Sequence, residues 1–147
     1  VVDSSGSLSA IQANFDGDIA SISFRDTIMN VSGSFDNING NPRNKIAAIT
    51  GSGTLLDWEP NHDTPFFSAM GEGVASPQKV FLQGIFSEIN GIPRGRIAAV
   101  GPTKGILDEW NPNLSRGGST FSISEIYPIG EDVFVGGTFT EAKGTPV

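Results

Sequence analysis

Hydrophobic residues along the chain fall into short runs rich in Val, Ile and Phe, and each run ends at Gly, Pro, Asn or Asp. Short β-branched and aromatic runs between turn-forming residues are typical of β-strands. No window sustains the 3.6-residue period of a helix. The clearest stretch predicts four successive strands, over Phe66–Met70, Val80–Phe86, Arg96–Val100 and Ile106–Trp110. The pattern therefore predicts an all-β fold made of many short strands.

This pattern is an internal repeat. Segment 33–49 (GSFDNINGNPRNKIAAI) aligns without a gap with segment 84–100 (GIFSEINGIPRGRIAAV), and 10 of the 17 positions are identical. A third copy starts at Gly137, so the starting glycines Gly33, Gly84 and Gly137 lie 51 and then 53 residues apart. A repeat of about 40 to 50 residues with four strands is the signature of a β-propeller blade.

The repeat divides the chain into blades. Segment 53–61 (GTLLDWEPN) matches segment 105–113 (GILDEWNPN), which we align with one residue inserted, and a degraded copy opens the chain. We expect a single β-propeller segment over residues 1–147, equivalent to about three four-stranded blades. Two blades are complete and one is split between the termini. The expected limits are residues 1–14 for the end of a partial blade, 15–64 and 65–114 for complete blades, and 115–147 for the start of a further blade.

The blade count raises the question of how a ring would close. Propellers typically have four to eight blades, so three cannot close a ring. We expect either a fragment of a longer chain, which a first residue of Val1 rather than Met favours, or several chains that complete one ring. Two such chains would give six blades. Open strand edges at both ends would otherwise invite pairing with another chain.

Residues that recur inside one chain are most simply structural. The glycines allow close backbone approach or a bulge, the phenylalanines are core anchors between blades, and the tryptophans pack between blades. The arginines form either an ion pair with the nearby Asp57 or Asp108, or bonds to backbone carbonyls. These repeat positions are Gly33, Phe35, Arg43, Trp58, Gly84, Phe86, Arg94, Trp110, Gly137 and Phe139.

Short repeated sequences indicate where each blade has a tight turn and where it has a closely packed strand. Asn39-Gly40 and Asn90-Gly91 are tight-turn signals, because Asn and Gly tolerate a positive φ. Ile-Ala-Ala occurs at 46–48 and again at 97–99, and its small residues suit a strand where sheets pack closely.

Composition excludes several classes of function. A net charge of −7 with only 9 basic residues disfavours nucleic acid as a partner. The chain has no cysteine, so disulfides and thiolate metal sites are excluded. No run of eighteen apolar residues is present, and we expect no membrane span.

Candidate sites for chemistry are few. Asn14, Asp16 and Asp18 resemble the start of a calcium loop, but the downstream Glu of such a loop is absent and the acidic spacing does not recur in the aligned loops. A solvated loop is the preferred interpretation. His62 is the single histidine and is expected on a surface loop, which disfavours a His-based triad. We expect no catalytic residues and no cofactor.

The repeat as a whole resembles a known family. The stretch VFVGGTFTEAKGTPV, with RIAAV and LDEWNPN in other copies, is similar to the delta-60 type β-propeller repeats of secreted and cell-surface bacterial proteins. Ser32 and Gln83 replace the first glycine of the Gly-Gly-x-Phe pattern in two copies, and Glu59 departs from the Trp-Asn-Pro-Asn corner. The resemblance implies an extracellular, multi-blade, non-catalytic module and transfers no active site.

The sequence thus favours a structural or adhesive β-propeller module, extracellular or at the cell surface, within a larger surface protein, fibre or multi-chain assembly. Its partners would be other blades of a longer chain or copies of itself. The alternative is a carbohydrate-binding propeller, in which Trp58, Trp110, Phe15 or Tyr127 would form platforms for glycans. An enzyme is disfavoured, because no pair of residues has convincing acid–base spacing.

Overall fold

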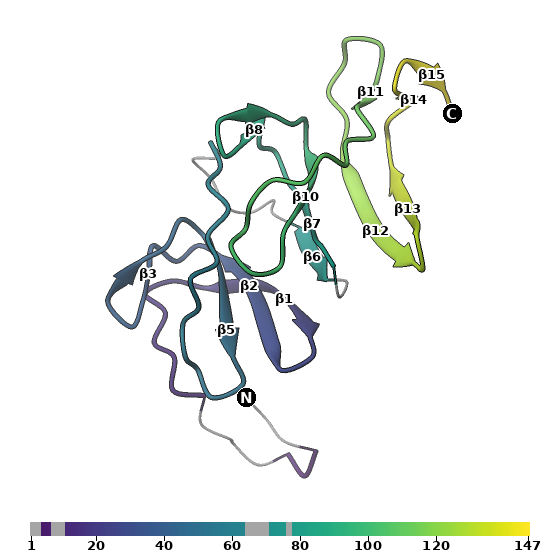
Figure 1. Cartoon of the computed structure of the whole chain (residues 1–147). Coiled ribbons are helices and arrows are strands. Elements are labelled where there is room, and N and C mark those ends of the chain that lie inside the picture. The colour runs from purple at the N-terminus through teal and green to yellow at the C-terminus, as the bar shows by residue number, and fades with distance from the viewer. Residues whose placement is uncertain (1–3, 7–10, 64–70, 76–77) are drawn as a thin grey trace.

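The structure, a computed structural model, describes residues 4–6, 11–63, 71–75 and 78–147, with the backbone alone for 71–75. Fifteen strands and no helix occur in these residues, which confirms the all-β prediction. They form three successive units, here defined as unit 1 (residues 15–63), unit 2 (71–113) and unit 3 (114–147) (Figure 1).

Unit 1 is an antiparallel sheet with a small hairpin. Its strands are β1 (Ile19–Arg25), β2 (Ile28–Gly33) and β5 (Ile46–Thr50), in the order β1-β2-β5, with β3 (Asn37–Ile38) and β4 (Asn41–Pro42) as the hairpin between β2 and β5. The chain then returns along β5, where Ile49 bridges Leu55 and the N–H of Leu56 donates to the carbonyl of Ala48 at 2.9 Å. Where the fourth strand was predicted, the structure has a short hydrogen-bonded segment with one isolated bridge and no regular strand.

Unit 2 repeats this arrangement. Its strands are β6 (Gly71–Ala75), β7 (Val80–Gln83) and β10 (Ile97–Val100), with the hairpin β8 (Glu88–Ile89) and β9 (Ile92–Pro93). Val100 bridges Leu107, and the N–H of Asp108 donates to the carbonyl of Ala99 at 2.9 Å. The predicted strand Phe66–Met70 lies outside the described residues, and the first described strand of the unit is β6.

Unit 3 contains the first part of the same arrangement. Its strands are β12 (Ile123–Ile129) and β13 (Asp132–Gly137), with the hairpin β14 (Glu141–Ala142) and β15 (Thr145–Pro146), and β11 (Leu114–Ser115) pairs with β14.

The hydrogen bonds correct one detail of the sequence alignment. The N–H of Leu56 donates to the carbonyl of Ala48, and the N–H of Asp108 donates to the carbonyl of Ala99. Ala48 and Ala99 are each the second alanine of the repeated Ile-Ala-Ala, so Leu56 and Asp108 occupy equivalent positions. Segments 53–61 and 105–113 therefore align without an insertion, and Asp57 corresponds to Glu109 rather than to Asp108. The expected insertion was wrong, because both nine-residue segments meet the preceding strand in the same register.

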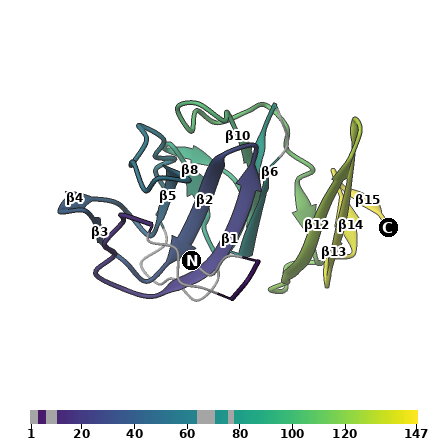
Figure 2. The ribbon, with the colours of Figure 1, turned by 90° about the horizontal axis from the view of Figure 1, so that it is seen from below.

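The units lie face to face, as the two perpendicular views show (Figures 1 and 2). The first strand of unit 2, β6, contacts both β1 and β12. One apolar cluster lies between units 1 and 2 and a second lies between units 2 and 3, while a third covers the outer face of unit 1. Successive side chains of β5 point to opposite faces and so belong to two of these clusters: Ile46 and Ala48 face unit 2, and Ala47 and Ile49 face outward.

The repeated glycine at the end of the second strand has a steric explanation. A Cβ on Gly33 would lie 1.9 Å from the carbonyl oxygen of Asp18, and a Cβ on Gly137 would lie 2.3 Å from that of Ser122. Each contact lies beside an irregularity in strand pairing, between Ile19 and Ser21 in unit 1 and at the matching place in unit 3. Only glycine permits this approach.

The Asn-Gly dipeptides form the tips of the small hairpins. Asn39 and Asn90 have φ of 52° and 53°, and Lys143 takes the same conformation at 49° in unit 3. A positive φ at both central residues is the geometry of a type I′ turn, which matches the twist of the flanking strands. The third copy thus keeps the turn without its asparagine.

Candidate functional site

The contact between units 1 and 2 shows how one unit joins the next. Trp58 is 0% exposed and packs with Val100, and its indole Nε1 donates to the carbonyl of Gly101 at 2.9 Å. Lys104 of unit 2 forms an ion pair with Asp57 of unit 1, and the hydrogen bond from Lys104 lowers the pKa of Asp57. Trp58 is therefore an internal tie between units, and its burial excludes it as a glycan platform.

The repeated arginines hold the fourth segment of each unit. Arg43 Nη2 donates to the carbonyl of Leu56 at 3.2 Å, and Arg94 Nη2 donates to that of Asp108 at 3.3 Å. Of the two interpretations, the structure favours bonds to backbone carbonyls. The ion pair that Arg43 does form is with Glu59, at 3.5 Å.

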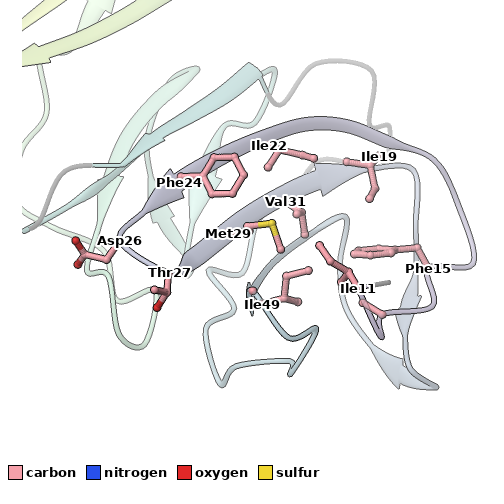
Figure 3. Close-up of a pocket in the computed structure, with 12 residues that line it drawn as sticks. Ile11, Phe15, Ile19, Ile22, Phe24, Asp26, Thr27, Met29, Val31 and Ile49 are labelled. Carbon is pink, nitrogen blue, oxygen red and sulfur yellow. The ribbon is translucent and has the colours of Figure 1, made fainter. Parts of the chain in front are cut away.

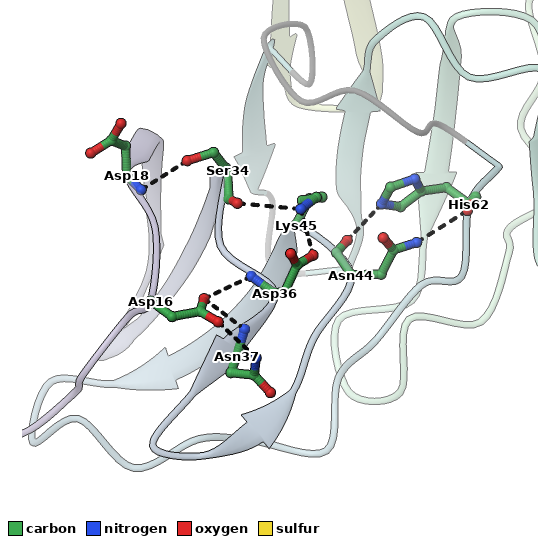
Figure 4. A network of polar contacts seen from close by, with 8 residues as sticks. All are labelled: Asp16, Asp18, Ser34, Asp36, Asn37, Asn44, Lys45 and His62. Atoms are coloured by element: carbon green, nitrogen blue, oxygen red, sulfur yellow. Dashed lines mark hydrogen bonds and ion pairs between the residues drawn. The ribbon is translucent and has the colours of Figure 1, made fainter.

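Aspartates tie the small hairpins of units 1 and 2 to the loops that precede them, and Figure 4 shows the contact in unit 1. The Oδ1 atom of Asp16 accepts hydrogen bonds from the backbone N–H groups of Asp36 and Asn37, both at 2.8 Å. Asp63 accepts from the N–H groups of Ser87 and Glu88 at 2.9 and 3.2 Å. A hydrogen bond from the side chain of Asn37 is the largest cause that lowers the pKa of Asp16, and one from the side chain of Ser87 does the same for Asp63; the backbone bonds lower both pKa values further.

The calcium candidates thus belong to a loop that bonds to the hairpin beside it. Asn14 exchanges bonds with Asn39, and the N–H of Asp18 donates to Ser34 Oγ at 2.9 Å. Asp16 recurs as Asp63, but Asp18 has no acidic counterpart, so the acidic spacing of the first loop does not repeat, as the sequence indicated. Across the described ranges, no group of three or more His, Cys, Asp or Glu is placed to hold a metal ion. The calcium site stays a prediction.

His62 is buried, not on a surface loop as the sequence indicated. It is 6% exposed, its Nε2 lies 2.7 Å from the carbonyl oxygen of Asn44, and its own carbonyl accepts from Asn44 Nδ2 at 3.2 Å (Figure 4). Burial is the largest cause of a lowered pKa for this imidazole. His62 forms a β-bridge with Ile89 of the unit 2 hairpin, which places it at the junction of two units. This contact with the next unit explains why a residue in a loop-like stretch of sequence is buried.

The outer face of unit 1 contains an apolar groove of about 740 Å³ (Figure 3). Met29 and Val31 form its floor and are covered in part by Ile11 and Phe15 from the preceding segment. Further along, it is lined by side chains of β1 that remain substantially exposed, namely Ile19, Ile22 and Phe24. We call this surface the first face.

Unit 3 exposes a second apolar surface on the opposite side. Tyr127 of β12 and Phe134 of β13 are direct cross-strand partners, and with Ile129 they are all more than half exposed. The other side of the same sheet packs on unit 2 through Ile126, which is buried. We call the exposed surface the last face.

Each face contains a position that is buried in another unit of the same chain. Ile22 of the first face is 48% exposed, whereas Ile126, at the same register position of unit 3, is 3% exposed. Phe134 of the last face is 59% exposed, whereas Phe81, at the same position of unit 2, is 3% exposed. Sequence reasoning missed both faces, although the distance of each residue from the repeated glycine would have identified these equivalences.

The remaining glycan candidates are distributed over the molecule. Trp110 is half-buried and meets Phe81 edge to face at 5.1 Å, and Phe15 meets Phe35 in the same way at 5.1 Å. Tyr127 is the one of these candidates with a largely exposed ring. The structure therefore does not bring the four aromatic candidates together.

No family model, curated protein or solved structure matches the chain. In the described part of the chain, no helix is long and apolar enough to cross a membrane.

Proposed function

We propose that this chain is a run of β-propeller blades and acts as a non-catalytic structural module, extracellular or at the cell surface, whose partners are further units of the same kind. The observation that carries the proposal is the pair Phe81 and Phe134, which share one position and differ only in whether a next unit covers them. Three units stacked face to face, with successive first strands in contact, are consistent with an arc of blades around an axis.

The polar residues of the repeat support a structural role. Asp16 and Asp63 bond to hairpin backbone, Arg43 bonds to a fourth-strand carbonyl, and His62 is buried at a junction between units. These polar side chains are thus engaged in bonds within a unit, as for Asp16 and Arg43, or between neighbouring units, as for Asp63. The extracellular location rests on the resemblance of the repeat to secreted and cell-surface proteins.

Sedimentation and light scattering over a wide concentration range, with negative-stain images, test the proposal. We expect head-to-tail association, in which the last face of one copy covers the first face of another, to give arcs or rings. Phe134→Glu should abolish the association. Ile106→Glu places the same charge on an exposed residue of unit 2 and is the matched control. A chain that stays monomeric at millimolar concentration would overturn the proposal.

Carbohydrate binding remains a second proposal, supported by the exposed cross-strand pair Tyr127 and Phe134. Aromatic rings on an open sheet face offer a flat apolar surface on which a sugar ring can stack. A glycan array at high protein concentration tests it. Binding that Tyr127→Ala removes is the expected result, and an array with no signal would refute this alternative.

A further inference from the structure

The strand β13 has a free edge. In the continuous stretch 78–147 that the structure describes, β13 pairs with β12 alone, whereas β2 lies between β1 and β5 and β7 lies between β6 and β10. Among the strands that the structure describes, none therefore pairs with the outer N–H and C=O groups of β13. Such an edge is a template for an added strand.

The apolar side chains beside this edge are less buried than their equivalents between units 1 and 2. Trp58 and Phe86 pack in one cluster with Ala98 and Val100 of β10 and are fully buried. Trp110 and Phe139 occupy the corresponding positions in the next cluster and are only partly buried. Strand β10 covers Trp58 and Phe86, whereas no described strand covers Trp110 and Phe139 in the equivalent way.

We propose that the β13 edge, together with the half-buried Trp110, is the docking site for an antiparallel strand with the sequence character of β5 and β10, an inference that rests on the proposed function. The register follows from unit 2, where Ile97 lies opposite Gln83 and Val100 opposite Val80. The corresponding positions of β13 are Gly136 and Val133.

The buried side chains of β10 define the chemistry of the occupant. All four residues of β10 are buried, and Ala98 and Ala99 are 0% exposed between the clusters on either side of the sheet. Ile97 and Ala99 enter one cluster and Ala98 and Val100 the other. The docking strand must therefore carry small residues at its centre and β-branched residues at its ends, without charge on either face.

The start of the strand has a repeated anchor. The N–H of Gly33 donates to the carbonyl of Lys45, and that of Gly84 donates to the carbonyl of Arg96, both at 3.0 Å. Lys45 and Arg96 both have a φ of 65°. Gly137 holds the equivalent position on β13, so the docking strand should present a basic residue just before its first isoleucine.

A second copy of the chain does not supply this strand without unfolding, since its own versions, β5 and β10, are already paired with β2 and β7 and consist almost entirely of buried residues. The occupant is instead an extended segment of this repeat sequence that is not already paired. Pairing of β13 with β13 of a second copy is the competing outcome.

A peptide with the sequence of residues 95–109 (GRIAAVGPTKGILDE) tests the proposal, because it contains β10, the segment that bridges back to β10 through Leu107, and no tryptophan. In the full chain with Trp58→Phe, Trp110 is the one remaining tryptophan. We expect saturable binding with a blue shift of its emission as the indole is covered. The same peptide with both central alanines replaced by glutamate should bind at least about tenfold more weakly, because it buries charge.

Hydrogen exchange of the unmodified chain gives a second readout that does not depend on the variant. The peptide should slow exchange of the amides of residues 132–137 and leave those of β2 unchanged. No emission shift together with no added protection at excess peptide would overturn the inference, as would protection of β13 that grows with chain concentration and not with peptide. Loss of peptide binding with association through Phe134 intact would refute this inference alone and leave the proposed function standing.

Discussion

Phe81 and Phe134 each lie three residues before a repeated glycine, yet one is buried between units 2 and 3 and the other lies on an open sheet face. Ile126 and Ile22 show the same contrast on the opposite side of their units. The strands are alike, so the difference arises from the presence or absence of a neighbouring unit. Both outer faces carry large exposed apolar residues, which supports the proposal that further units cover them.

The contrast has an energetic scale. Full burial of a large apolar side chain stabilises a protein by roughly 1.5–3 kcal/mol relative to leaving it exposed. The internal faces gain this stabilisation and the outer faces do not. Substitutions at equivalent positions should therefore have unequal effects on the free energy of unfolding.

The largest inequality should separate the two tryptophans. Trp58→Ala removes a fully buried indole and its bond to Gly101, so we expect a loss of about 3–5 kcal/mol. Trp110→Ala removes a half-buried indole and should cost about 1–2 kcal/mol. Urea unfolding followed by circular dichroism measures both, and equal losses would contradict the assignment of Trp58 as an internal tie.

The two phenylalanines provide the next comparison. Phe81→Ala should destabilise by about 3 kcal/mol or more, because it leaves a cavity between units 2 and 3. Phe134→Ala should change the stability of the monomer by less than about 1 kcal/mol. Both values come from chemical unfolding at a concentration where the chain is monomeric. A large loss for Phe134→Ala would mean that the last face is not open.

Asn30 sharpens the comparison, because it holds in unit 1 the position that Phe81 holds in unit 2. Asn30 is buried, and neither its Oδ1 nor its Nδ2 finds a hydrogen-bond partner in the described part of the chain. A buried polar group without a partner costs about 1–3 kcal/mol. Asn30→Leu should therefore stabilise the chain by about 1 kcal/mol in thermal or urea unfolding, and a clear loss of stability would show that the amide has a partner in solution.

The smallest effect concerns pH. Burial lowers the pKa of His62 from its ordinary 6.5, so the unfolded chain binds the proton more readily than the folded chain. Stability is complete above pH 6.5 and declines as the pH falls below it towards the folded pKa. His62 is the single histidine, so His62→Gln should flatten the fall in melting temperature between pH 7 and about 5.5. An unchanged slope would mean that His62 is solvated.

Much of the architecture follows from sequence because it is encoded locally and repeatedly. The alternation of short apolar runs, the glycines that permit close approach and the Asn-Gly turns all determine structure within a few residues. The candidate faces could not be predicted in this way, since the exposure of Phe134 depends on a neighbour and not on its own strand. His62 was misassigned for the same reason, because its burial comes from the hairpin of the next unit.

The central claim is that each unit joins the next in the same way, and pairwise distances between hairpin tips test it most directly. Because the chain has no cysteine, spin labels can be placed at introduced cysteines replacing the exposed equivalents Asn41, Ile92 and Thr145. The account predicts equal distances for the pairs 41–92 and 92–145. Clearly unequal neighbouring distances would contradict it.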